Sequence, residues 1–148
     1  MPKSFQQKLK ILYLMRVFAE KTDEAHPMSV KDLIAYLENF GIHAERKTIY
    51  DDIETLRVFG MDIMNRRERP SGFYLASREF EVAELKLLVD AVQSSRFLTT
   101  GKSRQLIQKL ESLTSIYQAK DLQRQVIVQN RVKNTNENIY YNIDEIHR

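Results

Sequence analysis

The sequence predicts a mainly α protein with one small β-hairpin. Apolar residues recur at helical spacing in several separate stretches, and one stretch between them alternates apolar and polar residues around a Pro-Ser-Gly turn. A length of 148 residues is enough for one ordinary domain or two small ones. We expect a first domain over residues 2–77, a helical segment over 78–123 and a connecting tail over 124–148.

The composition excludes several classes of protein. Hydrophobic residues make up 43% of the chain, enough to build a core, so global disorder is excluded. Without cysteine the chain has no disulfide, no thiolate metal site and no cysteine nucleophile. The sequence shows neither a run of roughly 20 apolar residues nor a signal peptide, so we expect a cytoplasmic protein. The net charge of +3 alone is too small to indicate a polyanionic partner.

The first predicted helix runs from Ser4 to about Glu20. A broad apolar stripe marks it: Phe5, Leu9, Ile11, Leu12, Met15, Val17 and Phe18. Residues 21–28 end in His26-Pro27, and because the residue before a proline is disfavoured in a helix, we expect a loop there.

A second helix begins after Ser29. The Ser29 side chain can accept a hydrogen bond from the backbone of Asp32, and the acid itself favours the positive start of a helix. The apolar positions that follow at helical spacing are Val30, Leu33, Ile34, Leu37 and Phe40. Gly41 then stands where a left-handed residue commonly ends a helix.

A third helix is predicted from about Arg46 to Val58, with Gly60 closing it. Its inward residues are Ile49, Ile53 and Leu56. Its outward residues are Arg46, Lys47, Tyr50, Asp51 and Glu54.

A β-hairpin with a basic tip follows the third helix. Residues 61–65 alternate apolar and polar, Pro70-Ser71-Gly72 has turn chemistry, and Phe73-Tyr74-Leu75 resumes the apolar run. Three helices followed by such a hairpin are the order of a winged helix-turn-helix. The sequence therefore predicts this fold for residues 2–77.

Beyond Ser77, two helices are predicted over about 80–95 and 100–115, joined closely enough to pack as an antiparallel pair. From Leu122 onward the pattern of apolar residues becomes weaker. Val126-Ile127-Val128 has β-like character, residues 133–138 form an Asn-rich polar stretch, and isoleucines at 139, 143 and 146 indicate a last helix.

Catalytic and metal-binding motifs fail on spacing. Gly101-Lys102-Ser103 would need a glycine at position 96 to be a phosphate-binding loop, but that residue is Arg96. The three histidines are far apart in sequence. Asp51 and Asp52 point about 100° apart on a helix, so they cannot share a proton as an acid–base pair. We expect no enzyme activity, no catalytic residue, no metal and no cofactor.

The helix-turn-helix offers a mechanism, because a helix presented by a turn fits the major groove of DNA. Arg46 and Lys47 lie at the end that reaches base edges, and Thr48 or Tyr50 could bond phosphate oxygens. The recognition helix would be residues 46–58, with the wing, about 64–74, on the backbone. The predicted DNA-binding residues are Arg46, Lys47, Thr48, Tyr50, Asp51, Arg66, Arg67 and Arg69.

A protein-interaction module is the alternative. Between residues 46 and 58 the charges balance, with Arg46, Lys47 and Arg57 against Asp51, Asp52 and Glu54. A winged helix can also act as a scaffold without binding DNA. Salt-sensitive binding to duplex DNA distinguishes the two hypotheses.

The stretch Lys47-Thr48-Ile49-Tyr50-Asp51-Asp52-Ile53-Glu54-Thr55-Leu56-Arg57 resembles the recognition helix of bacterial WYL-domain transcriptional regulators, whose pattern runs roughly R-T-I-Y-R-D-I-E-x-L. The similarity continues through Ser71–Leu75 and the helical segment 80–92. In two places the chain departs from the pattern: the turn between Gly41 and Ile49 is about two residues longer than usual, and Asp51 stands where the family often has arginine.

The resemblance implies a sequence-specific regulator that binds double-stranded DNA as a homodimer. It also implies that any effector ligand is bound by a C-terminal WYL domain. The chain has no tryptophan and no Trp-Tyr-Leu core, so we expect it to be the N-terminal part of such a regulator. Our expected dimer contact is the helical segment Phe80 to Ser115.

Overall fold

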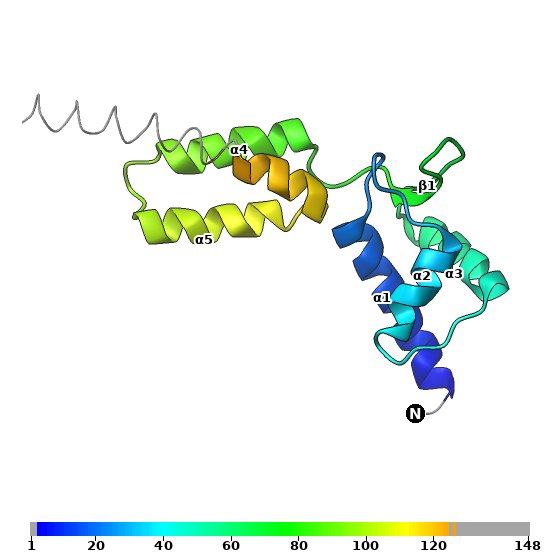
Figure 1. The fold of residues 1–148 in the computed structure, drawn as a ribbon. Coiled ribbons are helices and arrows are strands. Elements are labelled where there is room, and N and C mark those ends of the chain that lie inside the picture. The colour runs from blue at the N-terminus through cyan, green and yellow to red at the C-terminus, as the bar shows by residue number, and fades with distance from the viewer. Residues whose placement is uncertain (1–2, 125, 127–148) are drawn as a thin grey trace, which may run out of the picture.

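The computed structural model describes residues 3–124 and 126. The elements are α1 Lys3–Lys21, α2 Val30–Glu38, α3 Arg46–Phe59, β1 Ile63–Arg66, β2 Gly72–Leu75, α4 Val82–Ser94 and α5 Thr100–Glu111. Residues 116–124 are also helical. Figure 1 shows two lobes: α1–α3 with the hairpin form the first, and the remaining helices form an elongated second lobe. The predicted mainly α class, three helices and a hairpin followed by a helical segment, is confirmed.

The three helices of the first lobe enclose its core. The fully buried side chains at its centre include Leu14, Val17 and Phe18 of α1, Leu33 and Leu37 of α2, and Ile49, Ile53 and Leu56 of α3. Two members of the predicted stripe on α1, Phe5 and Leu12, are instead exposed. Lys10 is buried among these apolar neighbours, and its ammonium group lies 2.9 Å from the Asp52 carboxylate. A charge at this depth needs a partner, and the ion pair supplies it.

The predicted start of α2 is confirmed in detail. The Asp32 backbone N–H donates to the Ser29 hydroxyl oxygen at 3.1 Å, and the Ser29 backbone N–H donates to the Asp32 carboxylate at 3.0 Å. This reciprocal pair is a capping box, which satisfies backbone donors at the helix start. Gly41 lies in the turn after α2 with a φ of 74°, a value that favours glycine.

The hairpin is an antiparallel pair of strands that runs from Ile63 opposite Leu75 to Arg66 opposite Gly72. Sequence reasoning missed a third backbone segment beside it. Met28 exchanges two backbone hydrogen bonds with Phe73, of 2.9 and 2.8 Å. A Cβ at Gly72 would lie 2.5 Å from the Met28 carbonyl carbon, so only glycine lets the two backbones approach this closely.

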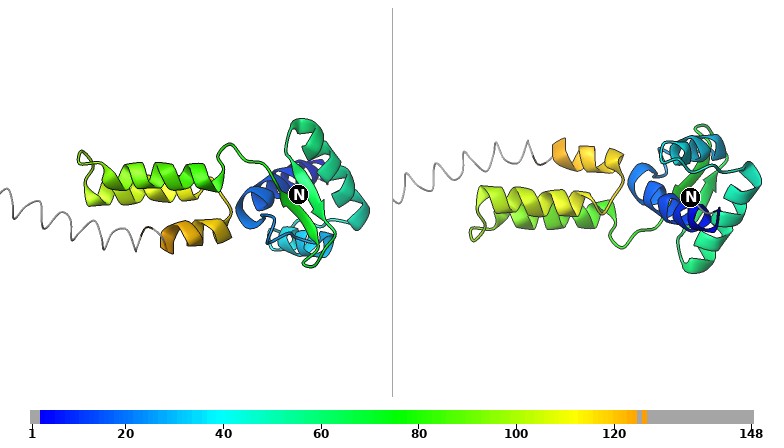
Figure 2. Two further views of the ribbon diagram at one scale, coloured as in Figure 1. Left: turned by 90° about the horizontal axis from the view of Figure 1, so that it is seen from above. Right: turned by 90° about the horizontal axis from the view of Figure 1, so that it is seen from below.

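The second lobe begins with α4 and α5, which pack side by side as the predicted antiparallel pair (Figure 2). The predicted helical segment extends to residue 123, but a separate helix over 116–124 was not predicted within it. Its start is marked by Ser115, whose hydroxyl oxygen accepts from the Gln118 backbone N–H at 3.1 Å. Val126 is helical, so the β-like prediction is wrong at that residue, while the other predictions for 127–148 lie outside the described residues.

Buried polar contacts join the two lobes. The Ser115 hydroxyl donates to the Asp23 carboxylate, and the His26 ring stacks on Tyr117 with centroids 3.7 Å apart. Burial raises the pKa of Asp23, but hydrogen bonds from Ser115 and His26 more than offset this, so the pKa lies below its ordinary value.

Arg78 ties the segment between the lobes to the end of α1. Its guanidinium donates to the carbonyl oxygens of Ala19 and Thr22 at 2.6 and 2.7 Å. The last carbonyls of a helix lack partners within it, so a cation there is favourable. Burial lowers the pKa of Arg78 from its ordinary value, yet arginine stays charged at any ordinary pH.

Candidate nucleic-acid interface

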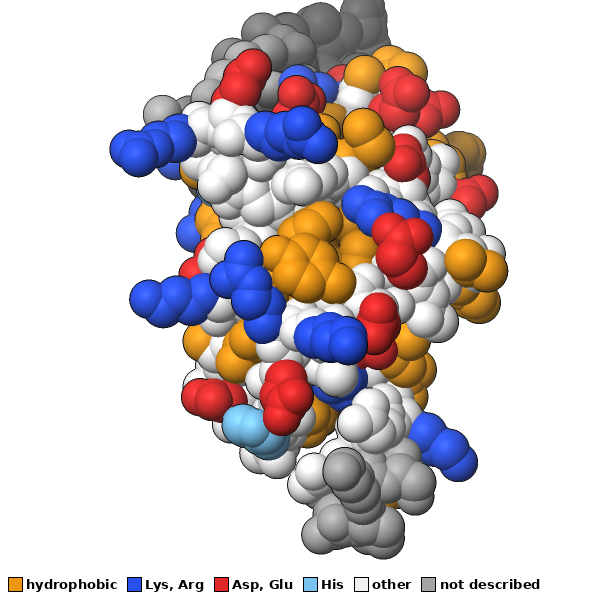
Figure 3. Space-filling view, turned by 90° about the vertical axis from the view of Figure 1, so that its right-hand side faces the viewer, with side chains coloured by type: hydrophobic (Ala, Val, Ile, Leu, Met, Phe, Trp, Pro, Cys, Tyr) orange, Lys and Arg blue, Asp and Glu red, His pale blue; other side chains and the backbone are white. Residues whose placement is uncertain are grey.

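The candidate interface is the face of the first lobe that carries α3 and the hairpin (Figure 3). Ile49, Ile53 and Leu56 point into the core, which leaves the opposite side of α3 exposed. Lys47, Asp51, Glu54 and Val58 follow one another along that side at spacings of three and four residues and are all exposed. Basic side chains surround a hydrophobic patch on this face, with acidic side chains among them.

Arg46 and Tyr50 form one unit at the start of α3. The Arg46 guanidinium lies 5.8 Å from the centre of the Tyr50 ring and donates to the phenol oxygen at 3.3 Å. The same ring packs edge-on against Phe73 of β2, with centroids 6.0 Å apart. This contact positions the start of α3 against the wing and orients Arg46.

Thr48 has a local partner, because its hydroxyl donates to the Glu45 carbonyl oxygen at 2.8 Å. Glu45 precedes the first residue of α3 and has no side-chain cap of its own. The Thr48 hydroxyl proton is therefore already used within the helix start. The hydroxyl oxygen of Thr48 can still accept a hydrogen bond from a ligand, and its backbone at the helix start can also contact one.

The acidic residues of α3 differ in their partners. Asp52 turns toward the core and pairs with Lys10, and Glu54 pairs with Arg57 one turn further along α3. Within the described part of the chain, the Asp51 carboxylate has no hydrogen-bond or ion-pair partner. Once the paired charges are set aside, two cations, Arg46 and Lys47, face one unpaired anion. The charge balance of zero therefore underestimates how positive the outer side of α3 is.

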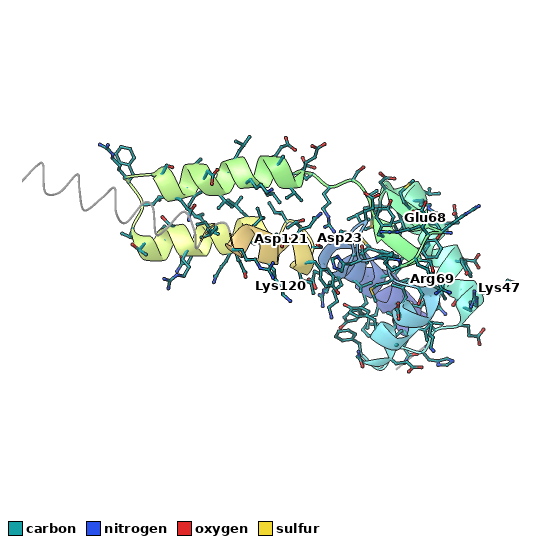
Figure 4. All side chains as sticks on the ribbon, turned by 45° about the horizontal axis from the view of Figure 1, so that its top comes forward. Asp23, Lys47, Glu68, Arg69, Lys120 and Asp121 are labelled. Atoms are coloured by element: carbon teal, nitrogen blue, oxygen red, sulfur yellow. The ribbon has the colours of Figure 1, made fainter. Side chains whose placement is uncertain are left out.

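The arginines of the wing have two different roles. Arg66 is half-buried and donates to the carbonyl oxygens of Glu24, at 2.6 Å, and of Arg69, at 3.3 Å. It therefore holds the tip of the wing against the loop between α1 and α2. Arg67 and Arg69 are exposed. In Figure 4, Arg69 and Lys47 lie at the end of the molecule away from α4 and α5.

The structure thus brings the start of α3 beside the hairpin through the Tyr50–Phe73 contact, with Lys47 and Arg69 at the same end of the molecule, whereas Arg66 turns to the loop between α1 and α2. Sequence reasoning missed the residues that support them. Arg57 donates through Nε to the Ile63 carbonyl oxygen at 2.9 Å and so links α3 to β1. The spacing of Glu54 and Arg57 could have indicated their ion pair, whereas nothing local indicated that Lys10 would neutralise Asp52.

Two further features were absent from the described residues, a cluster of metal ligands and a membrane-spanning helix. The described histidines and acids form no group of three or more placed to hold a metal ion. In residues 3–124 and 126, no helix combines the length and apolar character that a membrane span requires. Comparison with protein-family models, curated proteins and solved structures found no match.

Proposed function

We propose that the chain is a sequence-specific regulator that binds double-stranded DNA, with α3 in the major groove and the wing on the backbone. One observation carries this proposal: the exposed side of α3, on which Asp52 and Glu54 already have basic partners, lies beside the hairpin, and Lys47 and Arg69 lie at the same end of the molecule (Figure 4). An α-helix presented in this way matches the width of the major groove. The proposed action is binding alone, without a chemical step.

The exposed cations have distinct parts in this proposal. Lys47 and Arg46 at the N-terminal end of α3 would reach base edges, where either can donate to O6 or N7 of guanine. Arg67 and Arg69 would contact phosphates and so add affinity without sequence preference. Arg66 would support DNA binding indirectly, by holding the wing in place, because its guanidinium already donates to two carbonyl oxygens.

The proposal includes membership of the WYL-domain regulators, supported by the motif of residues 47–57, and a homodimer. A lone winged helix reads only a few base pairs, and two copies one helical turn apart multiply specificity. The second lobe offers a surface for the contact. An apolar groove between α4 and α5 is lined by Leu88, Ala91, Val92, Leu106, Leu110 and Leu113, with Lys109 at its edge.

A fluorescence-anisotropy titration against random and genomic duplexes at several salt concentrations tests the proposal. If each protomer engages roughly five phosphates, log K should fall with log salt with a slope of about −4 to −5, and twice that for a dimer. One fragment should bind more tightly than random DNA. A slope near zero would contradict the proposal and favour the alternative of a protein-interaction module, for which the apolar groove is the supporting observation.

The double variant Arg46→Ala/Lys47→Ala separates base reading from dimerisation. We expect it to lose sequence preference while sedimentation equilibrium shows the oligomeric state of the parent. The matched variant Leu110→Glu, on the apolar groove, should lower self-association and leave half-site preference intact. An unchanged sequence preference in the first variant would contradict the roles given to Arg46 and Lys47.

A further inference from the structure

Asp51 occupies the middle of the exposed side of α3. It lies one turn after Lys47 and one turn before Glu54 and Thr55, and its side chain is exposed. Within residues 3–124 and 126, the contact of Asp51 beyond the helix ladder is made by its backbone carbonyl, which accepts from the Thr55 hydroxyl at 3.1 Å. In the orientation proposed for DNA binding, this carboxylate would enter the major groove with Lys47.

The three acids of α3 provide an internal comparison. Asp52 and Glu54 each have a basic partner, so neither brings an uncompensated charge to the interface. The Asp51 carboxylate lacks one among the described residues, so its oxygens remain available as acceptors. The fold neutralises two acids of this helix and leaves the third, at the centre of the exposed side, free.

A free carboxylate next to DNA phosphates weakens binding by electrostatic repulsion. A base edge can compensate for this, because the exocyclic amino group of cytosine donates into the major groove and suits an aspartate acceptor. Resting on the proposed function, we propose that Asp51 is a specificity-determining residue that accepts a hydrogen bond from the N4 amino group of a cytosine.

Lys47 sets the position of that cytosine. Four residues along an α-helix correspond to about 6 Å, close to two base-pair steps of about 3.4 Å each. Lys47 is a donor and suits guanine, whereas Asp51 is an acceptor and suits cytosine. The half-site should therefore contain a guanine contacted by Lys47 and, within about two base pairs of it, a cytosine contacted by Asp51.

Selection of bound sequences from a random duplex library tests this inference, using the full chain and the variants Asp51→Ala and Asp51→Asn. The parent should select cytosine at one position of each half-site. Asp51→Ala should select all four bases there, keep the other positions, and bind random DNA more tightly than the parent. Asp51→Asn should shift the position toward adenine, because asparagine pairs with N6 and N7 of adenine.

A probe of the single amino group sharpens the test. The cytosine in the selected duplex is replaced by a 2-pyrimidinone nucleotide, which lacks the N4 amino group. This replacement should lower the affinity of the parent by about 5- to 100-fold more than it lowers the affinity of Asp51→Ala. Glu54→Gln is the matched control, since it removes an acid from the same side of α3 and should keep the cytosine preference.

The outcomes are separable. Equal cytosine preference in the parent and Asp51→Ala, with DNA binding retained, would overturn the role of Asp51 and leave the proposed function standing. Absence of salt-sensitive binding by the parent would overturn the proposed function and this role with it. Because Asp51 is exposed, the two Asp51 variants should keep the thermal unfolding midpoint of the parent, so that differences in their binding reflect the interface.

Discussion

The first lobe buries apolar side chains from its three helices and both strands, whereas the described part of the second lobe buries four, Leu85, Val89, Ile107 and Leu122, and leaves several leucines facing solvent. Leu33 of α2 is fully buried, but Leu87 of α4 is 70% exposed, and Leu88 and Leu113 are also exposed. The first lobe has three helices and a hairpin around one core. In the second lobe, α4, α5 and the shorter helix over 116–124 cover less of each other's apolar surface. The first lobe thus encloses a core of its own, whereas the second presents exposed apolar side chains, the kind of surface that partners cover.

The largest expected effect comes from the same substitution made in each lobe. Leu33→Ala removes fully buried methyl groups and should lower the free energy of unfolding by about 3–5 kcal/mol. Leu87→Ala removes a mostly solvated side chain and should change it by less than about 0.5 kcal/mol. Urea denaturation measures both. Equal losses would contradict the difference drawn between the lobes.

The second expected effect concerns the buried ion pair of the first lobe. Lys10→Met leaves the Asp52 carboxylate without its partner, which should cost about 3 kcal/mol, at the low end for such pairs because Asp52 retains some contact with solvent. The double variant Lys10→Met/Asp52→Asn should regain most of this loss. Lys8→Met, at an exposed position of the same helix, is the control. Chemical denaturation of the four proteins completes the comparison.

A smaller effect is expected where the lobes meet. Ser115→Ala removes the hydroxyl that donates to Asp23 and should cost about 1–2 kcal/mol. The folded protein holds the pKa of Asp23 below its ordinary value, so this contribution is present above pH 4 and is lost as the pH falls through the folded pKa. The difference in stability between the parent and Asp23→Asn should therefore shrink with decreasing pH below about 4. A difference independent of pH would contradict the assignment.

The smallest effect is expected in DNA binding at the wing. On the proposed function Arg67 would contact one phosphate, so Arg67→Gln should weaken binding to all sequences about equally and reduce the magnitude of the salt slope by about 1. Arg66→Gln should also weaken binding to all sequences, but by loosening the wing, since Arg66 donates to the Glu24 and Arg69 carbonyl oxygens. Amide hydrogen exchange at residues 67–71 should therefore accelerate. Unchanged exchange would contradict the positioning role of Arg66.

The sequence by itself determined the elements of the first lobe. The Ser29 cap at the start of α2, the apolar spacing of Ile49, Ile53 and Leu56, and the Pro-Ser-Gly turn are local signals, and each was found where it was predicted. The helix over 116–124 was missed although Ser115 and Gln118 have the spacing of a cap. Its apolar pattern is short, and its burial depends on α4 and α5.

Only the tertiary structure decided how the candidate interface is charged and held. The sequence placed Arg46, Lys47 and the wing arginines outward, but charge counting could not tell that Asp52 would pair with Lys10. Nor could it tell that Arg66 would bond the Glu24 carbonyl, or that Met28 would lie beside Phe73. Such contacts join segments that are distant in sequence, and they form only after the core has brought those segments together. Local spacing therefore predicts the outward side of α3, although not of α1, whereas the packed fold decides which of those side chains remain free to bind.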